Sequence, residues 1–184
     1  MDLYELLLKI NMEEERIGGG AASALMGSIA ANMAAMVARI SIGKNFGLSD
    51  EEYEEIIRKA GVLAEELKKG AVEDHNSYAG IVAAYRLPKG SEQEKAERRR
   101  KIDDAAYKAS VVPLENGKGC MAVKELCSRL MERSNPSAFS DLYCALEMSA
   151  LGVKGCILNV KANLPTIKDA ERVSALQEGL KILK

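Results

Sequence analysis

The chain has 184 residues, and its 26 Lys and Arg nearly balance its 27 Asp and Glu, leaving a net charge of −1. This length predicts a single domain over residues 1–184. The charge balance gives no electrostatic basis for binding nucleic acid or an anionic membrane. One histidine excludes the paired-histidine zinc motifs and the facial iron triad, so acid–base chemistry is expected from carboxylates, lysine or tyrosine.

The compartment is predicted from the first residues and the cysteines. Met1–Glu5 carries two acids where a secretory signal would carry Lys or Arg, which predicts a cytoplasmic protein without a targeting segment. The cysteines form no CxxC motif, which favours buried, reduced thiols over a zinc or redox site. They are Cys120, Cys127, Cys144 and Cys156.

The first half of the chain predicts helices on either side of a glycine run. One helix is expected over residues 3–14, a break at 18–20, and a second helix over 21–41. Residues 17–38 carry no charge, but a stretch rich in Ala, Gly, Ser and Met suits a buried helix better than a membrane span. Its small residues recur every four positions and would allow close packing within the fold or across a dimer. They are Ser23, Gly27, Ala31 and Ala35.

The second half predicts further helices with clear start signals. A capping box at Ser49 and another at Ser91 each place Glu three residues after Ser. The first opens a helix that stops before Pro88, and Pro113 is expected in the first turn of a separate helix. The expected helices after Pro88 cover about 91–110, 113–132, a segment from Ser137 or Ser140 to Lys154 or beyond, and 166–183. Long helices with short joins predict an all-α antiparallel helical bundle.

Asp74 is the most informative single residue. Three- and four-residue steps place it on the same face as Ala71, Tyr78 and Ile81, so its carboxylate projects from an apolar stripe. Loss of hydration would raise the pKa of an unpaired carboxylate there, as suits a general acid or base. The alternative is an acid that is partly exposed or paired with Lys or Arg. His75 lies about 100° around the helix and would flank such a site.

Three other features are candidates for ligand binding. Gly18–Gly20 opens a helix, where free N–H groups can bind an anion or a carbonyl, although a glycine run is also an ordinary turn. Lys44 is a candidate partner for a ligand carboxylate, or a cation that complements a helix C-terminus. Asn159 and Asn163 stand four apart and could read a heterocycle or cap helix ends.

Six segments, in chain order, resemble the formiminotetrahydrofolate cyclodeaminase / methenyltetrahydrofolate cyclohydrolase family. They are residues 18–27 (GGGAASALMG), 36–44 (MVARISIGK), 74–78 (DHNSY), 85–89 (YRLPK), 140–141 (SD) and 159–163 (NVKAN). The resemblance spans nearly the whole chain. Ile17 and Ala21 depart from it, since the family usually has Pro before the glycines and Ser after them.

The resemblance implies an all-helical homodimer that binds folate in clefts without a metal, a nucleotide or another cofactor. It also implies that Asp74 takes part in catalysis. The positions implied to bind substrate are Gly18, Gly19, Gly20, Ser23, Lys44, Arg86, Asp141, Asn159 and Asn163.

Two reactions are consistent with this resemblance. A cyclohydrolase opens 5,10-methenyltetrahydrofolate to 10-formyltetrahydrofolate, and a cyclodeaminase closes formiminotetrahydrofolate with loss of ammonia. The sequence lacks a formiminotransferase domain, which favours the cyclohydrolase as the expectation. The alternative to an enzyme is a non-catalytic helical module that dimerises through the small-residue ridge.

Overall fold

The computed structural model describes residues 17–183, and these residues form long helices without a strand, as the helical periodicity predicts. The α-helices are α2 (Gly19–Arg39), α3 (Asp50–Tyr85), α4 (Glu92–Leu130), α5 (Phe139–Asn163) and α6 (Ala170–Ile182), with 3-10 turns η1 (Pro136–Ala138) and η2 (Leu164–Thr166). The helix expected over residues 3–14 lies outside the described residues.

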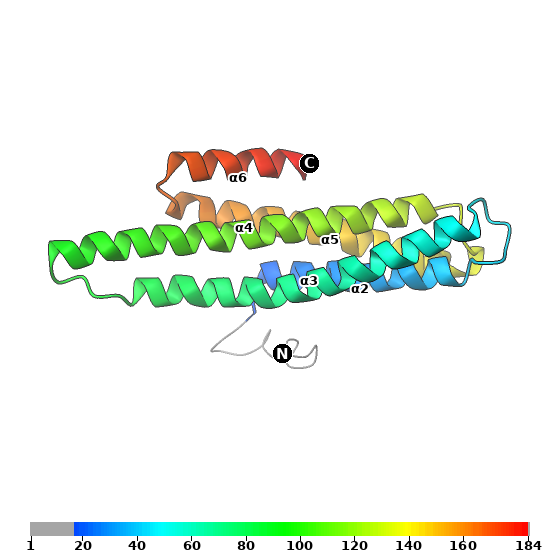
Figure 1. The fold of residues 1–184 in the computed structure, drawn as a ribbon, viewed down its shortest axis with the longest axis horizontal. Helices are drawn as coiled ribbons and strands as arrows, with labels where there is room; N and C mark the ends of the chain where they lie inside the picture. The colour runs from blue at the N-terminus through cyan, green and yellow to red at the C-terminus, as the bar shows by residue number, and fades with distance from the viewer. Residues whose placement is uncertain (1–16, 184) are drawn as a thin grey trace.

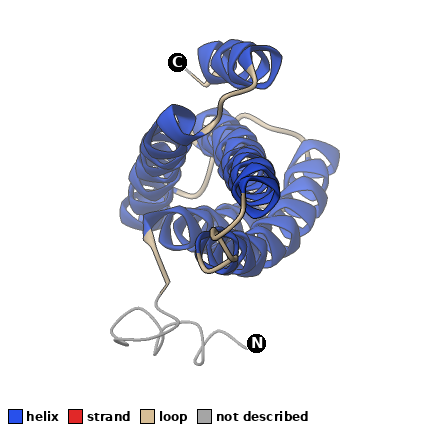
Figure 2. Cartoon of the chain, turned by 90° about the vertical axis from the view of Figure 1, so that its left-hand side faces the viewer, coloured by secondary structure: helices blue, strands red, loops and turns tan. Residues whose placement is uncertain are grey.

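Helices α2 to α5 form a ring of four, which is visible when the bundle is viewed along its length (Figure 2). Each helix packs against the next along the chain, and α5 returns to pack against α2. Short joins turn the chain back after each helix, so neighbouring helices are antiparallel (Figure 1). The last helix, α6, lies outside the ring against α4. The predicted antiparallel bundle is confirmed.

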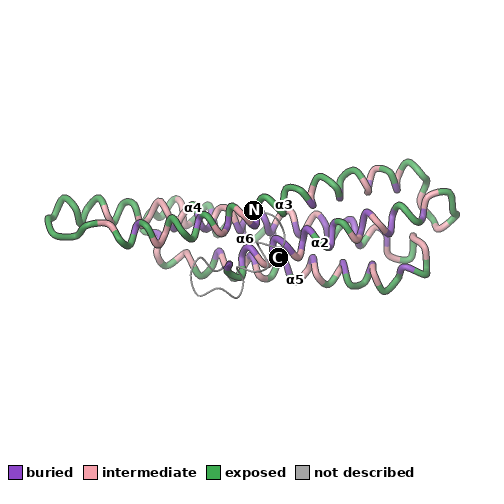
Figure 3. The backbone as a smooth tube through the Cα atoms, turned by 90° about the horizontal axis from the view of Figure 1, so that it is seen from below, coloured by how far each residue is buried: buried purple, intermediate pink, exposed green. Residues whose placement is uncertain are grey.

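Helices α3 and α4 are longer than their two partners. They have 36 and 39 residues, whereas α2 and α5 have 21 and 25. The additional residues of α3 and α4 form a two-helix arm that extends beyond the ring and is largely exposed (Figures 1 and 3). Beyond the start of α2 and the end of α5, the inner faces of α3 and α4 are therefore no longer covered by these two shorter helices.

The core is aliphatic and depends on small residues in α2. A Cβ at Gly27 would lie 3.0 Å from the side chain of Leu67, so α3 approaches the backbone of α2 closely. Ser28 donates to the carbonyl of Ala64 across the same interface at 2.7 Å. The small-residue ridge thus packs within the fold. Although α2 has the length and composition of a membrane span, most of it is buried against other helices, as in a core helix.

Several predicted helix ends are correct and others shift. Both capping boxes form, at Ser49 and at Ser91, with the serine and the glutamate bonded reciprocally. The last helix begins at Ala170, after an Asp169 cap, because Leu164–Thr166 makes a separate 3-10 turn. Helix α5 begins at Phe139, with neither predicted serine as its cap.

The prediction of two helices around Pro113 is wrong. Pro113 lies inside the single helix α4, about midway along it. A proline removes one N–H from the helix and leaves the carbonyl four residues earlier, that of Ala109, without its intrahelical donor. The side chain of Asn163 donates to this carbonyl at 2.9 Å. Because a neighbouring helix supplies the missing donor, α4 continues through the proline.

The cysteine prediction is correct for three thiols and wrong for one. All four cysteines are free, and Cys120, Cys127 and Cys156 are buried. Cys144 is exposed, because it lies on the outer face of α5.

Candidate active site at the junction of the ring and the arm

The first turn of α2 comes very close to α3 at Gly20. A Cβ at this position would lie 2.7 Å from Oδ2 of Asp74 and 2.8 Å from Nδ2 of Asn159, closer than real Cβ atoms approach. Gly18 and Gly19 are open to solvent and would tolerate a side chain. Only the third glycine of the run is therefore required by packing, and it brings the start of α2 against both polar side chains.

Asp74 occupies the position predicted from the apolar stripe. It lies on α3 with 8% of its surface exposed, and its carboxylate accepts from the backbone N–H of Ala21 in the first turn of α2. Gly18, the N-cap of α2, offers no side chain to the unpaired N–H groups. Asp74 therefore caps α2 from a different helix.

Burial dominates the electrostatics of Asp74. It raises the pKa of the carboxyl from 3.8 to about 6, and the hydrogen bond from Ala21 opposes this change only in part. No Lys or Arg among residues 17–183 makes an ion pair with it or lowers its pKa. The alternative of a structural ion pair is thus not supported among the described residues, and a carboxyl with this pKa can exchange protons near neutral pH.

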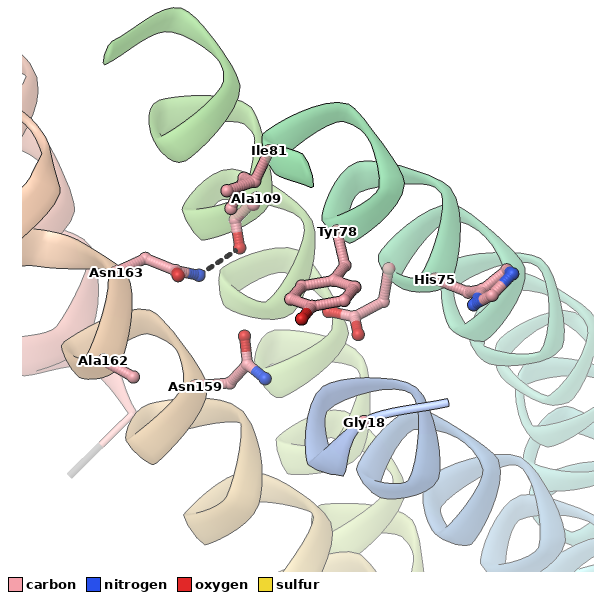
Figure 4. Close-up of a pocket in the computed structure, with 9 residues that line it drawn as sticks. Gly18, His75, Tyr78, Ile81, Ala109, Asn159, Ala162 and Asn163 are labelled. Atoms are coloured by element: carbon pink, nitrogen blue, oxygen red, sulfur yellow. Dashed lines mark hydrogen bonds between the residues drawn. The ribbon is translucent and has the colours of Figure 1, made fainter. Parts of the chain in front are cut away.

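A cavity of about 380 Å³ opens beside Asp74 where the ring meets the arm. Its size falls in the range of small-molecule sites. The lining comes from the start of α2 (Gly18), from α3 (Asp74, His75, Tyr78, Ile81), from α4 (Ala109) and from the end of α5 (Asn159, Ala162, Asn163). In Figure 4 the ring of Tyr78 and the amides of Asn159 and Asn163 converge on this space, whereas the imidazole of His75 points away.

Two predicted amides belong to this cavity, and the structure distinguishes them. The Nδ2 of Asn159 faces the start of α2, next to Gly20. The Nδ2 of Asn163 donates to the carbonyl of Ala109 on α4. Both lie on one face of the last turns of α5, as their four-residue spacing predicts.

Other predicted binding residues lie elsewhere in the chain. Lys44 follows the far end of α2, which the helical rise places about 30 Å from Gly20. Asp141, in the first turn of α5, lies about 27 Å along that helix from Asn159. Arg86 caps the end of α3, about 18 Å beyond Asp74. One chain therefore does not bring these three residues to the cavity.

Ser23 also lies outside the cavity. It is buried between α2 and α5, donates to the carbonyl of Gly19 at 2.6 Å and packs where a Cβ on Gly155 would otherwise be. Its geometry supports helix packing.

Sequence reasoning missed part of the lining. Tyr78 is 51% exposed and Ile81 is half-buried, so the stripe that carries Asp74 becomes a cavity wall where the ring ends. Ala109 contributes its backbone carbonyl, which no residue type reveals. The signal that could have found it is Pro113, four residues later, which frees that carbonyl.

His75 lines the edge of the cavity and holds one unusual atom. Its Nδ1 is buried without a hydrogen-bond partner among the described residues. Groups of three or more His, Cys, Asp or Glu side chains that could hold a metal ion are absent from residues 17–183.

A family model described as Formiminotransferase-cyclodeaminase matches residues 2–181 of this chain. The chain belongs to the Formiminotransferase-cyclodeaminase family. The family predicted from the sequence motifs is therefore confirmed. The resemblance noted at Gly18–Gly20, Asp74 and Asn159–Asn163 corresponds in space to one cavity.

Relatives within this family differ in length. A methenyltetrahydrofolate cyclohydrolase of Methylorubrum extorquens is 32% identical over 168 residues, which cover 89% of this chain and 80% of that protein. A formimidoyltransferase-cyclodeaminase of Rattus norvegicus is 26% identical over 153 residues, which cover 83% of this chain but 28% of that protein. A Dictyostelium discoideum protein of the same name is 29% identical, and 30% of its length is covered.

A solved structure supports the fold of this family member. The crystal structure of formiminotetrahydrofolate cyclodeaminase from Thermotoga maritima superposes with a TM-score of 0.85 at 23% identity, covering all of this chain and 88% of that one. The ring of four helices with its arm is therefore the fold of that protein as well.

Proposed function

We propose that this chain is a folate one-carbon enzyme that hydrolyses 5,10-methenyltetrahydrofolate to 10-formyltetrahydrofolate. The observation that carries the proposal is Asp74, a buried carboxyl in a cavity, without an ion-pair partner among the described residues. A relative of similar length, 32% identical, is named for this activity.

The charge of the substrate explains why an unpaired buried acid suits this site. The methenyl carbon bridges two nitrogens in a cationic amidinium, so the bound substrate supplies the positive charge that the protein does not. An opposite charge nearby favours the ionised carboxylate and lowers its pKa. Asp74 is therefore expected to be more fully ionised in the complex than in the free protein.

The reaction needs one group that both accepts and donates a proton. Asp74 takes a proton from the water that adds to the methenyl carbon, giving a neutral tetrahedral adduct. The bond from this carbon to N5 then breaks while Asp74 returns its proton to N5. The hydroxyl proton leaves as the formyl group forms on N10, and one proton is released overall.

The cyclodeaminase reaction is the second candidate. Its support is the match to formimidoyltransferase-cyclodeaminases, although the chain spans about a third or less of those proteins. In that reaction N10 attacks the formimino carbon, and Asp74 protonates the departing ammonia. Both reactions pass through a tetrahedral centre at the same one-carbon unit, and both use the carboxyl of Asp74.

The test supplies wild type and Asp74→Asn with each folate separately. We expect wild type to bleach the absorbance band of 5,10-methenyltetrahydrofolate, and Asp74→Asn to lose at least a hundredfold in rate. The amide oxygen can still accept from Ala21, so the cap on α2 persists in the variant. Turnover of formiminotetrahydrofolate alone would select the cyclodeaminase, and turnover of neither would favour a non-catalytic dimerisation module.

We also propose that the enzyme is a homodimer formed through the outer face of α2. Apolar residues recur there at alternating steps of four and three, and each of them is at least partly exposed, although Met33 and Met36 also pack against the core. The residues of this row are Ala22, Met26, Ile29, Met33, Met36 and Ile40. Of these, Ile29 is 41% exposed and Ile40 is 39% exposed. Soluble proteins rarely expose a continuous row of apolar side chains.

A further inference from the structure

The cavity contains a backbone acceptor that a proline creates. Pro113 has no N–H, so the carbonyl of Ala109, four residues earlier in α4, receives no bond from its own helix. Ala109 is 5% exposed and lines the cavity. A buried carbonyl of this kind needs a donor from elsewhere.

Asn163 supplies that donor and is oriented by it. Its Nδ2 lies 2.9 Å from the carbonyl oxygen of Ala109, as the dashed line in Figure 4 marks. When the amide nitrogen donates to the Ala109 carbonyl, the amide oxygen points away from that carbonyl. No described residue donates to this Oδ1, and Asn163 lines the cavity.

The α4–α5 side of the cavity therefore presents acceptors. The oxygen of Asn163 is free, and the carbonyl of Ala109 has a second lone pair. Resting on the function proposed above, we propose that Pro113 is a positioning residue that fixes Asn163 as the acceptor for the amide and amino N–H groups of the folate pyrimidine ring. This assigns the 2-amino-4-oxo edge of the pterin to the end of α5, and it leaves the methenyl bridge for Asp74.

An alternative is that Asn163 only repairs the helix at Pro113. The two accounts differ for Pro113→Ala, which restores the N–H of α4 and lets it compete with Asn163 for the Ala109 carbonyl. Repair alone predicts unchanged ligand affinity, because the carbonyl stays satisfied. Positioning predicts weaker binding, because the amide is released to rotate.

The experiment measures Kd by calorimetry for tetrahydrofolate and for its analogue with methyl in place of the 2-amino group. We expect Pro113→Ala and Asn163→Ala each to weaken tetrahydrofolate binding roughly five- to tenfold, and to reduce the preference of wild type for the 2-amino ligand. The double variant should bind no more weakly than Asn163→Ala alone, since Pro113 acts through Asn163. Val112→Ala, beside the proline but outside the cavity, is the matched control.

The outcomes separate this proposal from the proposed function. Unchanged Kd in both single variants, or an unaltered 2-amino preference, would overturn the positioning role. Additive losses would show that Pro113 does not act through Asn163, and would also overturn it. Turnover of the methenyl substrate by wild type is scored separately, so a protein that binds but does not hydrolyse contradicts only the proposed function. Absence of tetrahydrofolate binding by wild type contradicts both.

Discussion

The Asp74 carboxyl combines two functions that are usually carried by different residues. It closes the first turn of α2 by accepting from Ala21, and it faces a cavity with a pKa near 6. The helix terminus favours the charged form, whereas burial favours the neutral form, and burial has the larger effect. The result is a carboxyl that can hold or release a proton at physiological pH.

The stability of the fold should depend on pH through Asp74. Because its pKa is raised to about 6 in the folded chain, the folded state binds the proton more tightly than the unfolded state. The free energy of unfolding then falls as pH rises from about 4 to 6. We expect Asp74→Asn to be more stable than wild type at pH 8 by ~1–3 kcal/mol, with the difference closing at pH 4. Urea unfolding at both pH values measures it, and a less stable variant at pH 8 would contradict the burial argument.

Gly20 should be the sensitive position of the glycine run. In Gly20→Ala the new methyl group meets Asp74 and Asn159, so the start of α2 must move away from α3. We expect a loss of ~2 kcal/mol or more in unfolding free energy and a steep fall in turnover. Gly80→Ala, on the exposed arm with open space around it, is the control and should keep wild-type activity. Wild-type kinetics in Gly20→Ala would show that this approach is not needed.

At the scale of elements, the register of α3 against α4 sets where Asp74 stands. The side chain of Asn116 on α4 donates to the carbonyl of Gly70 on α3 at 3.1 Å, one turn before Asp74. Asn116 occupies the space where a Cβ on Gly70 would lie. This contact holds the two long helices together just before the arm leaves the ring.

Replacing glycine by alanine at two different positions of α3 tests this register. Gly70→Ala should cost ~2–4 kcal/mol and reduce activity, because the methyl group collides with the buried Asn116. Gly61→Ala, in the same helix with nothing within 4 Å, should instead stabilise the protein by ~0.5–1 kcal/mol. Thermal unfolding of both variants gives the comparison. Equal effects of the two substitutions would mean that the Asn116 contact does not determine the packing.

The sequence predicted most of the helices, but it did not predict where the shorter helices end and leave the cavity open. Capping boxes at Ser49 and Ser91 and the stripe through Asp74 are local patterns, so they were readable without a structure. The cavity arises because α2 and α5 are shorter than α3 and α4, which is a relation between distant segments. The role of Pro113 was missed for the same reason, since its helix is continued by a donor from Asn163, fifty residues later.

At the scale of the molecule, the motifs that resemble the family divide between two ends of the bundle. Gly18–Gly20, Asp74 and Asn159–Asn163 meet at the cavity, whereas Lys44 and Asp141 lie near the opposite end of the ring. The binding roles predicted for the second group stay predictions. The apolar face of α2 runs between the two ends.

The proposed dimer predicts a change in mass when this face is charged. Ile29→Glu should convert a dimer into a monomer, because it places a charge in the middle of the apolar row on α2. Val62→Glu, on α3 and 57% exposed, should leave the dimer intact. Sedimentation equilibrium at micromolar concentration measures both. A monomeric wild-type protein, or a dimer unaffected by Ile29→Glu, would contradict the assignment of this face.

In the proposed mechanism, the buried carboxyl of Asp74 performs the proton transfers at the methenyl bridge. The most direct test of this role is the pH dependence of kcat/KM for 5,10-methenyltetrahydrofolate, corrected for uncatalysed hydrolysis. Wild type should rise to a plateau with an apparent pKa of about 6, the value that burial gives Asp74. Asp74→Asn should lose both the rate and this inflection. A variant that retains the wild-type rate with the same inflection would contradict the role of Asp74 in proton transfer.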